Sequence, residues 1–222
     1  MLYTYRPSTW MVILFLLVFW PVASILLTSD QFSAAQIKNL TLEVYLSTLL
    51  VEILLILIVA WALLRAKEGP ATVGLVSFNP KNILIGVLFL FFAATLFNFL
   101  SHFIRSLEQP EEIAHLLPRT NLDYAVWILL SLVAAIGEEL SFRGFLITRM
   151  APVLGSYWAA ALLSSIAFGF GHFYQGPVGV LFTGIYGLLF AGLFYWRKSL
   201  VPCIVAHFLQ DALAPWFFRL TE

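Results

Sequence analysis

Side chains that could catalyse hydrolysis or bind a metal lie in three short stretches of the second half of the chain. These stretches are Glu138-Glu139-Leu140-Ser141-Phe142-Arg143, Phe168-Gly169-Phe170-Gly171-His172 and His207-Phe208-Leu209-Gln210-Asp211. Each is surrounded by apolar sequence of the kind that crosses a membrane. An ionisable side chain inside a membrane helix costs about 2.5–3.5 kcal/mol on insertion scales, so each one is a candidate for function.

The first stretch predicts one paired and one unpaired carboxylate. On an α-helix, Glu139 and Arg143 lie on one face at positions i and i+4, in the order that favours an ion pair. Glu138 lies about 140° around the helix from Arg143 and lacks this partner. An unpaired carboxylate in a low-dielectric environment is suited to act as a general base. The alternative is a hydrated helix end, although the apolar pattern continues over residues 145–150.

The two histidine stretches place their polar residues at helical spacing as well. Phe168 and His172 share one helical face, and so do His207 and Asp211. Each histidine alone could be a structural hydrogen-bonding residue. Polar faces on three separate membrane helices must meet inside the bundle, however, because lipid does not tolerate them. We therefore expect two Glu, two His, one Asp and one Arg around one cavity.

The composition indicates which elements must position these side chains. The chain has 222 residues, of which 61% are apolar and 11% are charged, and its net charge is zero. Its mean hydropathy is +0.93. These values exclude a soluble globular enzyme, a disordered chain and a nucleic-acid-binding protein. Cys203 is the one cysteine, which excludes an internal disulfide and a cysteine-built metal cluster. We expect an all-α, polytopic transmembrane helical bundle with a catalytic cavity within the membrane.

Uncharged stretches of about 20 residues predict about seven transmembrane helices. Their expected ranges are 10–27, 46–64, 82–104, 122–150, 155–174, 177–196 and 199–218, and we interpret the first as a retained helix rather than a cleaved signal peptide. One integral membrane domain results, with three spans and an interfacial loop in residues 1–121 and the four motif-bearing spans in residues 122–222. The bias of Lys and Arg, eight against four, predicts a cytoplasmic N-terminus in an inner or plasma membrane.

Other residues within the spans have competing interpretations. Glu52 in span two either packs as a polar group or faces the cavity. Cys203 has no charged activator beside it in the sequence, which disfavours a thiol nucleophile. The expected ranges place Glu138 near mid-span and His172 near the far end of span five, so the two meet only if boundaries shift or helices tilt. Small residues give span six a narrow face that suits tight packing: Gly184, Gly187, Ala191 and Gly192.

The three stretches, in this order and at these spacings, resemble the signature of the CPBP family. This family contains intramembrane proteases related to the CAAX-processing protease Rce1 and the bacterial Abi proteins. The similarity covers about residues 122–218, whereas the first three spans are similar in hydropathy only. The resemblance implies a membrane helical bundle with a glutamate-dependent peptidase site that requires no metal and no cofactor.

The resemblance also implies a role for each matching residue. Glu138 corresponds to the base that activates water, and His172 to the side chain that holds this water. His207 and Asp211 correspond to the pair that stabilises the oxyanion. The supporting positions are Glu139, Arg143 and Phe168.

One position varies within the family pattern: its last residue is often Asn, and here it is Asp211. An ionised Asp accepts hydrogen bonds and cannot donate one to an oxyanion. Either Asp211 is protonated by burial, or it orients His207 and stabilises its charged form, so that His207 donates alone. We favour the second interpretation.

The expected function is hydrolysis of a peptide bond in a membrane-tethered or lipidated protein or peptide, with the lipid bilayer as the second partner and no nucleic acid. Prenylated CAAX tails, maturing peptides and C-terminal sorting signals are all compatible substrates. One alternative is a zinc-dependent membrane protease, although no His-Glu-x-x-His helix is present. The other is a non-catalytic binding, immunity or transport protein on the same scaffold.

Overall fold

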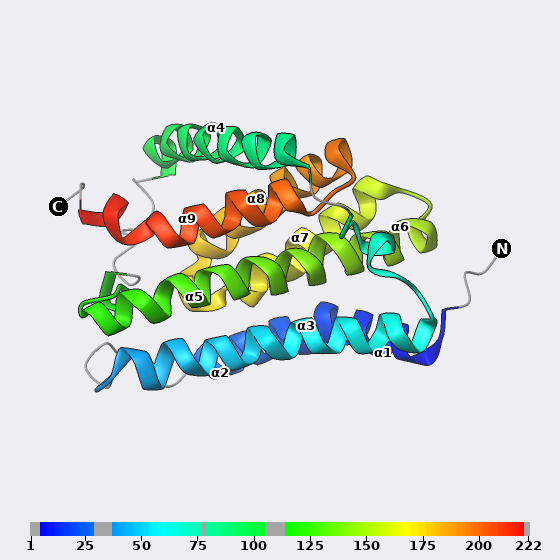
Figure 1. Ribbon diagram of the computed structural model, residues 1–222, viewed down its shortest axis with the longest axis horizontal. Helices are drawn as coiled ribbons and strands as arrows, with labels where there is room; N and C mark the ends of the chain where they lie inside the picture. The colour runs from blue at the N-terminus through cyan, green and yellow to red at the C-terminus, as the bar shows by residue number, and fades with distance from the viewer. Residues whose placement is uncertain (1–4, 29–36, 77–78, 105–113, 220–222) are drawn as a thin grey trace.

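The chain is built from long helices, as the computed structural model shows for residues 5–28, 37–76, 79–104 and 114–219. These described residues contain no strand. Five helical segments are long and apolar enough to cross a membrane, and α7 is a shorter apolar helix. The structure therefore confirms the predicted all-α, polytopic class of fold (Figure 1).

The described part of the chain contains nine α-helices: α1 (Pro7–Leu14), α2 (Trp20–Thr28), α3 (Leu46–Ala66), α4 (Pro80–Ile104), α5 (Asn121–Glu138), α6 (Thr148–Leu154), α7 (Tyr157–Gly171), α8 (Gly176–Arg197) and α9 (Val201–Arg219). Because α1 continues into α2 and α5 continues into α6, they form seven continuous helical rods. π-Helical segments join α1 to α2, precede α3 and join α5 to α6: η1 (Phe15–Phe19), η3 (Leu40–Tyr45) and η6 (Glu139–Ile147). Short 3-10 turns lie in the connections: η4 (Pro70–Val73), η5 (Ala114–Leu116) and η7 (Phe173–Gln175). Residues 105–113 of the expected interfacial loop lie outside the described residues.

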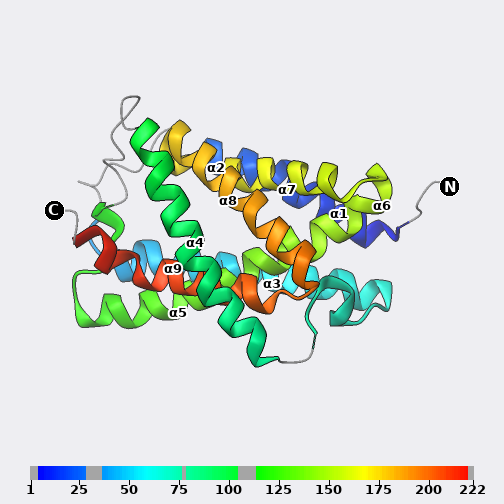
Figure 2. The same cartoon turned by 90° about the horizontal axis from the view of Figure 1, so that it is seen from above.

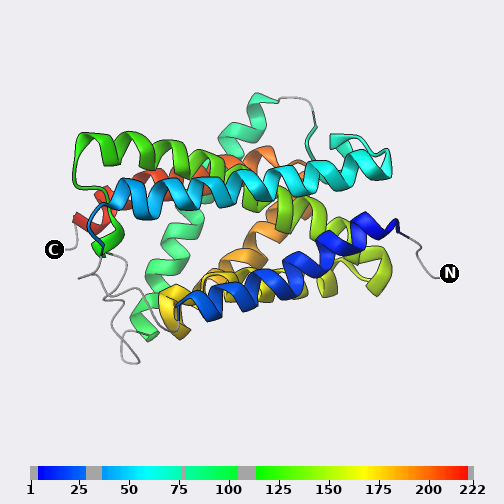
Figure 3. The same cartoon turned by 90° about the horizontal axis from the view of Figure 1, so that it is seen from below.

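The rods pack into one bundle. Seen from above, α2 and α7 run along one edge and α5 along the other, while α8 and α4 cross obliquely (Figure 2). The view from below shows α3 beside α5 and the first rod beside α7 (Figure 3). The closest neighbours are α7 with α8, α4 with α9, and α5 with both α9 and α3. The polar stretches on α5–η6, α7 and α9 are thereby brought together.

The turn between α6 and α7 sets the depth of the site. Gly155 adopts a left-handed conformation that ends α6, and the Ser156 side chain accepts a hydrogen bond from the Ala159 N–H to begin α7. Glu138 lies 16 residues before the end of α6, and His172 lies 15 residues after the start of α7. The two stretches are similar in length, and Glu138 Oε1 lies 3.7 Å from His172 Nε2, so the two residues reach the same depth. The sequence made the meeting of Glu138 and His172 conditional on shifted boundaries or tilted helices, and the boundaries are shifted: α6 extends further and α7 ends earlier than the expected ranges.

Close backbone contact between α7 and α8 depends on the small residues that the sequence singled out. A Cβ atom on Gly169 would lie 2.7 Å from the Val180 carbonyl oxygen and 3.2 Å from Gly184 Cα. A Cβ atom on Gly187 would lie 3.2 Å from Ser165 Cβ. The predicted tight packing of span six is confirmed at these positions.

We predict that Gly169→Ala lowers the stability of the bundle by about 1–3 kcal/mol, because the new methyl group collides with backbone that cannot rotate away. Thermal unfolding of the purified protein in micelles, followed by tryptophan fluorescence, measures the effect. Gly192→Ala on α8 is the matched control, since its Cβ would meet only a Trp158 ring atom at 3.9 Å. Equal melting temperatures for the two variants would contradict this account of the packing.

Candidate active site

The helix that carries Glu138 and Glu139 widens at this point. Glu138 is the last residue of α5, and Glu139 begins the nine-residue π-helical segment η6, all of whose residues are buried. π-Helical segments inside α-helices are frequently found at functional sites. The two glutamates are therefore buried within the bundle, and the alternative of a hydrated interfacial helix end is wrong.

Glu139 and Arg143 form a fully buried ion pair. Arg143 Nη1 lies 3.0 Å from Glu139 Oε1, and the two side chains are 2% and 0% exposed. The Arg143 guanidinium also lies 4.1 Å from the centre of the Phe168 ring and 5.4 Å from that of Phe190. Cation–π contacts of this kind stabilise a cation that has little access to water. The predicted ion pair is confirmed, although the segment that carries it is π-helical.

The His207 imidazole lies among three carboxylates. Its Nδ1 is 2.9 Å from Glu139 Oε1, and its Nε2 is 3.6 Å from Glu138 Oε2 and 3.4 Å from Asp211 Oδ2. A carboxylate that is paired with the Arg143 guanidinium is ionised and can only accept a hydrogen bond, which assigns a proton to His207 Nδ1. The shortest contact that orients His207 thus comes from Glu139, whereas the sequence suggested Asp211.

His172 ends α7 and faces Glu138 from the other side. Its Nδ1 lies 2.9 Å from the Phe168 carbonyl oxygen, and its ring centre lies 4.7 Å from that of Phe168. A carbonyl oxygen only accepts, so Nδ1 donates and Nε2 is directed toward the site. His172 Nε2 lies 3.7 Å from Glu138 Oε1. Phe168 therefore positions His172 through its carbonyl and Arg143 through its ring.

Glu138 occupies the centre of this arrangement. Each carboxylate oxygen faces the Nε2 atom of one histidine, at 3.7 Å for His172 and 3.6 Å for His207. Its Oε2 is buried and has no hydrogen-bond partner among the described residues. Asp211, with 33% of its side chain exposed, is the most accessible member of the group. The structure thus brings the four predicted catalytic residues together from three helices.

Glu52 is a further carboxylate at this site, and the sequence left its role open. It lies on α3 and is 3% exposed. A Cβ atom on Gly137 would lie 2.8 Å from Glu52 Oε2, so the carboxyl group rests against the residue that precedes Glu138. A charge inside an apolar span was the sequence signal for it. The contact with Gly137 could not be predicted, because no pattern on α3 specifies which helix it faces.

Cys203 is not placed to react. It is fully buried, and its Sγ lies 3.7 Å from the Phe190 carbonyl oxygen.

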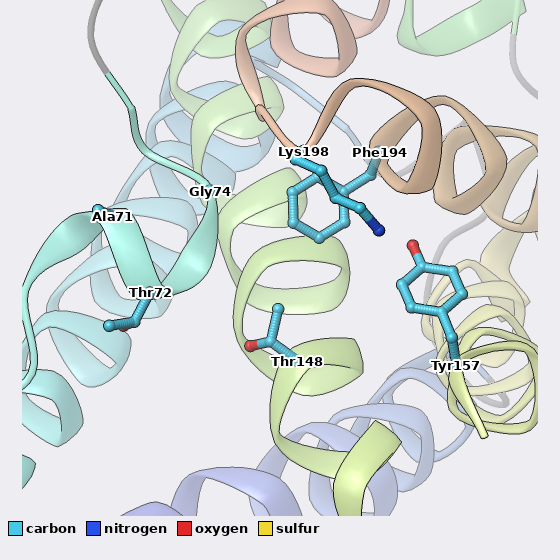
Figure 4. Close-up of a pocket in the computed structure, with 7 residues that line it drawn as sticks. All are labelled: Ala71, Thr72, Gly74, Thr148, Tyr157, Phe194 and Lys198. Atoms are coloured by element: carbon cyan, nitrogen blue, oxygen red, sulfur yellow. The ribbon is translucent and has the colours of Figure 1, made fainter. Parts of the chain in front are cut away.

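A pocket of about 240 Å³ lies near the α6–α7 turn, and none of the candidate catalytic residues lines it (Figure 4). Its lining residues are Ala71, Thr72, Gly74, Thr148, Tyr157, Phe194 and Lys198. In the described parts of the chain, no three His, Cys, Asp or Glu side chains are arranged to hold a metal ion.

The fold and the site together define a polytopic helical membrane protein with a buried carboxylate–histidine centre. Residues 120–213 match the family described as type II CAAX prenyl endopeptidase Rce1-like. This match covers most of α5 to α9, and it is consistent with the CPBP and CAAX protease family that the three stretches resemble. No curated protein and no solved structure matches the chain.

We predict that Arg143→Leu destabilises the protein by about 3–5 kcal/mol, because it leaves the Glu139 carboxylate buried without its cation. The readout is the thermal unfolding temperature in micelles. The double variant Glu139→Gln with Arg143→Met removes both charges and regains most of the loss, since a buried ion pair is often replaceable by neutral residues. A single variant as stable as the wild type would contradict the importance of this pair.

Proposed function

We propose that the chain is a glutamate-dependent, metal-independent intramembrane endopeptidase. The observation that carries the proposal is the position of Glu138 between the Nε2 atoms of His172 and His207, inside a bundle of helices apolar enough to span a membrane. The match to the Rce1-like family supports a peptidase. The substrate is a membrane-tethered or lipidated protein or peptide, and the family description favours a prenylated C-terminal tail.

In this mechanism, Glu138 and His172 hold the attacking water. Glu138 Oε1 and His172 Nε2 are 3.7 Å apart, close enough for one water molecule to donate a hydrogen bond to each. Glu138 removes a proton from the water, and the resulting hydroxide attacks the carbonyl carbon of the scissile peptide bond. The same Glu138 then gives this proton to the leaving amine nitrogen as the carbon–nitrogen bond breaks.

His207 stabilises the oxyanion that forms during the attack. Its Nδ1 donates to Glu139, so donation from Nε2 requires the ring to carry both protons. The carboxylates of Glu139 and Asp211 balance the charge of such a ring. A fixed donor in a site with little water stabilises a developing negative charge strongly. Asp211 supports His207 in this mechanism and does not itself donate.

The two halves of the chain have different roles in the proposed site. The motif-bearing helices in residues 122–222 supply the reacting groups, and the first three spans in residues 1–121 enclose them. Contacts of α3 with α5, α2 with α7 and α4 with α9 join the two parts. We place both parts in one integral membrane domain.

We predict that Glu138→Gln and His172→Ala each lower kcat/KM for a membrane-tethered peptide by about 10²–10⁴-fold, because each removes a group that handles the water proton. The assay uses purified protein in lipid nanodiscs and a prenylated peptide library, and each variant is measured with and without a metal chelator. Glu43→Gln is the matched control, since Glu43 is exposed at the start of the rod that carries Glu52.

The outcomes separate the rival functions. Activity that the chelator abolishes and zinc restores would indicate a metal-dependent protease. A well-folded wild type that binds the library and cleaves nothing would indicate a non-catalytic binding protein. Cleavage that survives both substitutions would overturn the assignment of Glu138 and His172.

The proposal places the N-terminus in the cytoplasm, which a thiol-labelling experiment tests. Cys203 is replaced by Ala, and a single cysteine is then introduced at exposed Ala71 or at exposed Lys38, which lie beyond opposite ends of the η3–α3 rod. A membrane-impermeant thiol reagent added to intact cells should label Lys38→Cys and leave Ala71→Cys unlabelled. The reverse labelling pattern would show the opposite orientation.

A further inference from the structure

The buried carboxyl group of Glu52 has no partner that explains its presence in an apolar helix. Glu52 is 3% exposed, and its Oε2 has no hydrogen-bond partner among the described residues. No ion pair to Glu52 forms in the described part of the chain. Isolated burial of a carboxylate is strongly unfavourable. An apolar side chain at this position would make α3 more stable in a membrane, so the presence of Glu52 points to a functional role.

Gly137 provides the space that this carboxyl group occupies. A Cβ atom on Gly137 would lie 2.8 Å from Glu52 Oε2 and 3.1 Å from the Glu52 carbonyl oxygen. Any larger residue would therefore push α3 and the Glu52 side chain away from α5. The glycine lets Glu52 approach the backbone immediately before Glu138.

The ionisable groups around Glu52 are those of the site. The ones that act on it most strongly are Glu138 from α5 and His207 and Asp211 from α9. Tyr174, in η7, also interacts with Glu52 electrostatically. Glu52 is therefore electrostatically coupled to the residues that the proposed mechanism uses, from a helix outside the family match.

Two neighbouring carboxylates cannot both be ionised in an environment of low dielectric constant. Glu138 Oε2 and Glu52 Oε2 are both buried without a hydrogen-bond partner among the described residues. Each oxygen is an acceptor that lacks a donor. One proton held by the pair lowers its charge from −2 to −1.

We propose that Glu52 is a positioning residue for Glu138, and that the two carboxyl groups hold one proton, which stays on Glu52 while Glu138 works as the base. This inference rests on the proposed peptidase function. During attack, the water proton moves to Glu138 and the pair becomes neutral. When Glu138 protonates the leaving amine, the pair returns to −1, and Glu52 has neither gained nor lost a proton.

The first measurement needs no substrate. An infrared difference spectrum between wild type and Glu52→Gln at neutral pH should show the carbonyl stretch of a protonated carboxyl group in the wild type alone. Glu43→Gln, an exposed carboxylate on the same rod, should leave that band in place. A wild type without the band would overturn the proposal, whatever the protein cleaves.

The second measurement is the cleavage assay, and it distinguishes positioning from packing. Glu52→Gln keeps the size of the side chain, so a packing role predicts wild-type kinetics. Our proposal predicts a fall in kcat on the order of 100-fold with KM unchanged, because the base is misplaced while the substrate still binds. Glu52→Asp retains a carboxyl group and should recover part of kcat.

A second variant covers the case in which Glu52→Gln fails to fold. Gly137→Ala leaves Glu52 in the chain but presses on its carboxyl group, so it should shift the infrared band and lower kcat. Unchanged band and kinetics in Gly137→Ala would contradict the proposal. If Glu138→Gln cleaves as well as the wild type, the proposed function itself fails, and the infrared result still decides the state of Glu52.

Discussion

The cost of burying charge in an apolar bundle governs the arrangement of this protein. The burial of the Glu139 carboxylate is offset by two contacts of its Oε1 atom, with Arg143 Nη1 at 3.0 Å and with His207 Nδ1 at 2.9 Å. The first contact joins residues of one helix, and the second joins η6 to α9. A single carboxylate therefore neutralises the cation and fixes the imidazole that faces Glu138. Because breaking either contact would leave a buried charged or polar group unpaired, the position of α9 against η6 is specified electrostatically as well as by packing.

Phe168 connects the remaining histidine to the same network. Its ring covers the Arg143 guanidinium, and its carbonyl accepts from His172. The three motif stretches are thus linked through contacts that do not involve Glu138. This leaves the carboxylate of Glu138 with a histidine on either side and no short hydrogen bond to a described residue. Such a group is available for a reaction, whereas Glu139 is committed to holding the site together.

The helices and part of the site could be predicted from the sequence, and the features that could not be predicted have physical causes. Apolar runs predicted the rods, and the spacing of Glu139 and Arg143 predicted their ion pair. The relative depth of Glu138 and His172 could not be decided from the sequence, because hydropathy does not locate a helix end that Gly155 and Ser156 determine. The sequence predicted the contact of His207 with Asp211, which lies at 3.4 Å, but not the shorter contact with Glu139. A neighbour at i+4 is visible in a sequence, whereas Glu139 approaches from another helix, through a π-helical segment that no hydrophobic pattern reveals.

The length of α7 has a consequence for the surroundings of the candidate site. Its 15 residues extend about 22 Å, and the hydrocarbon core of a bilayer is about 30 Å thick. A straight helix of this length is too short to cross the apolar layer, and His172 follows the end of α7 that adjoins the candidate site. Non-helical backbone at this depth must be satisfied by protein or by water. The Phe173 N–H finds Ser24 Oγ at 3.3 Å, on the first rod. The end of α7 thus places polar groups, His172 and the Phe173 N–H, beside Glu138 among apolar helices.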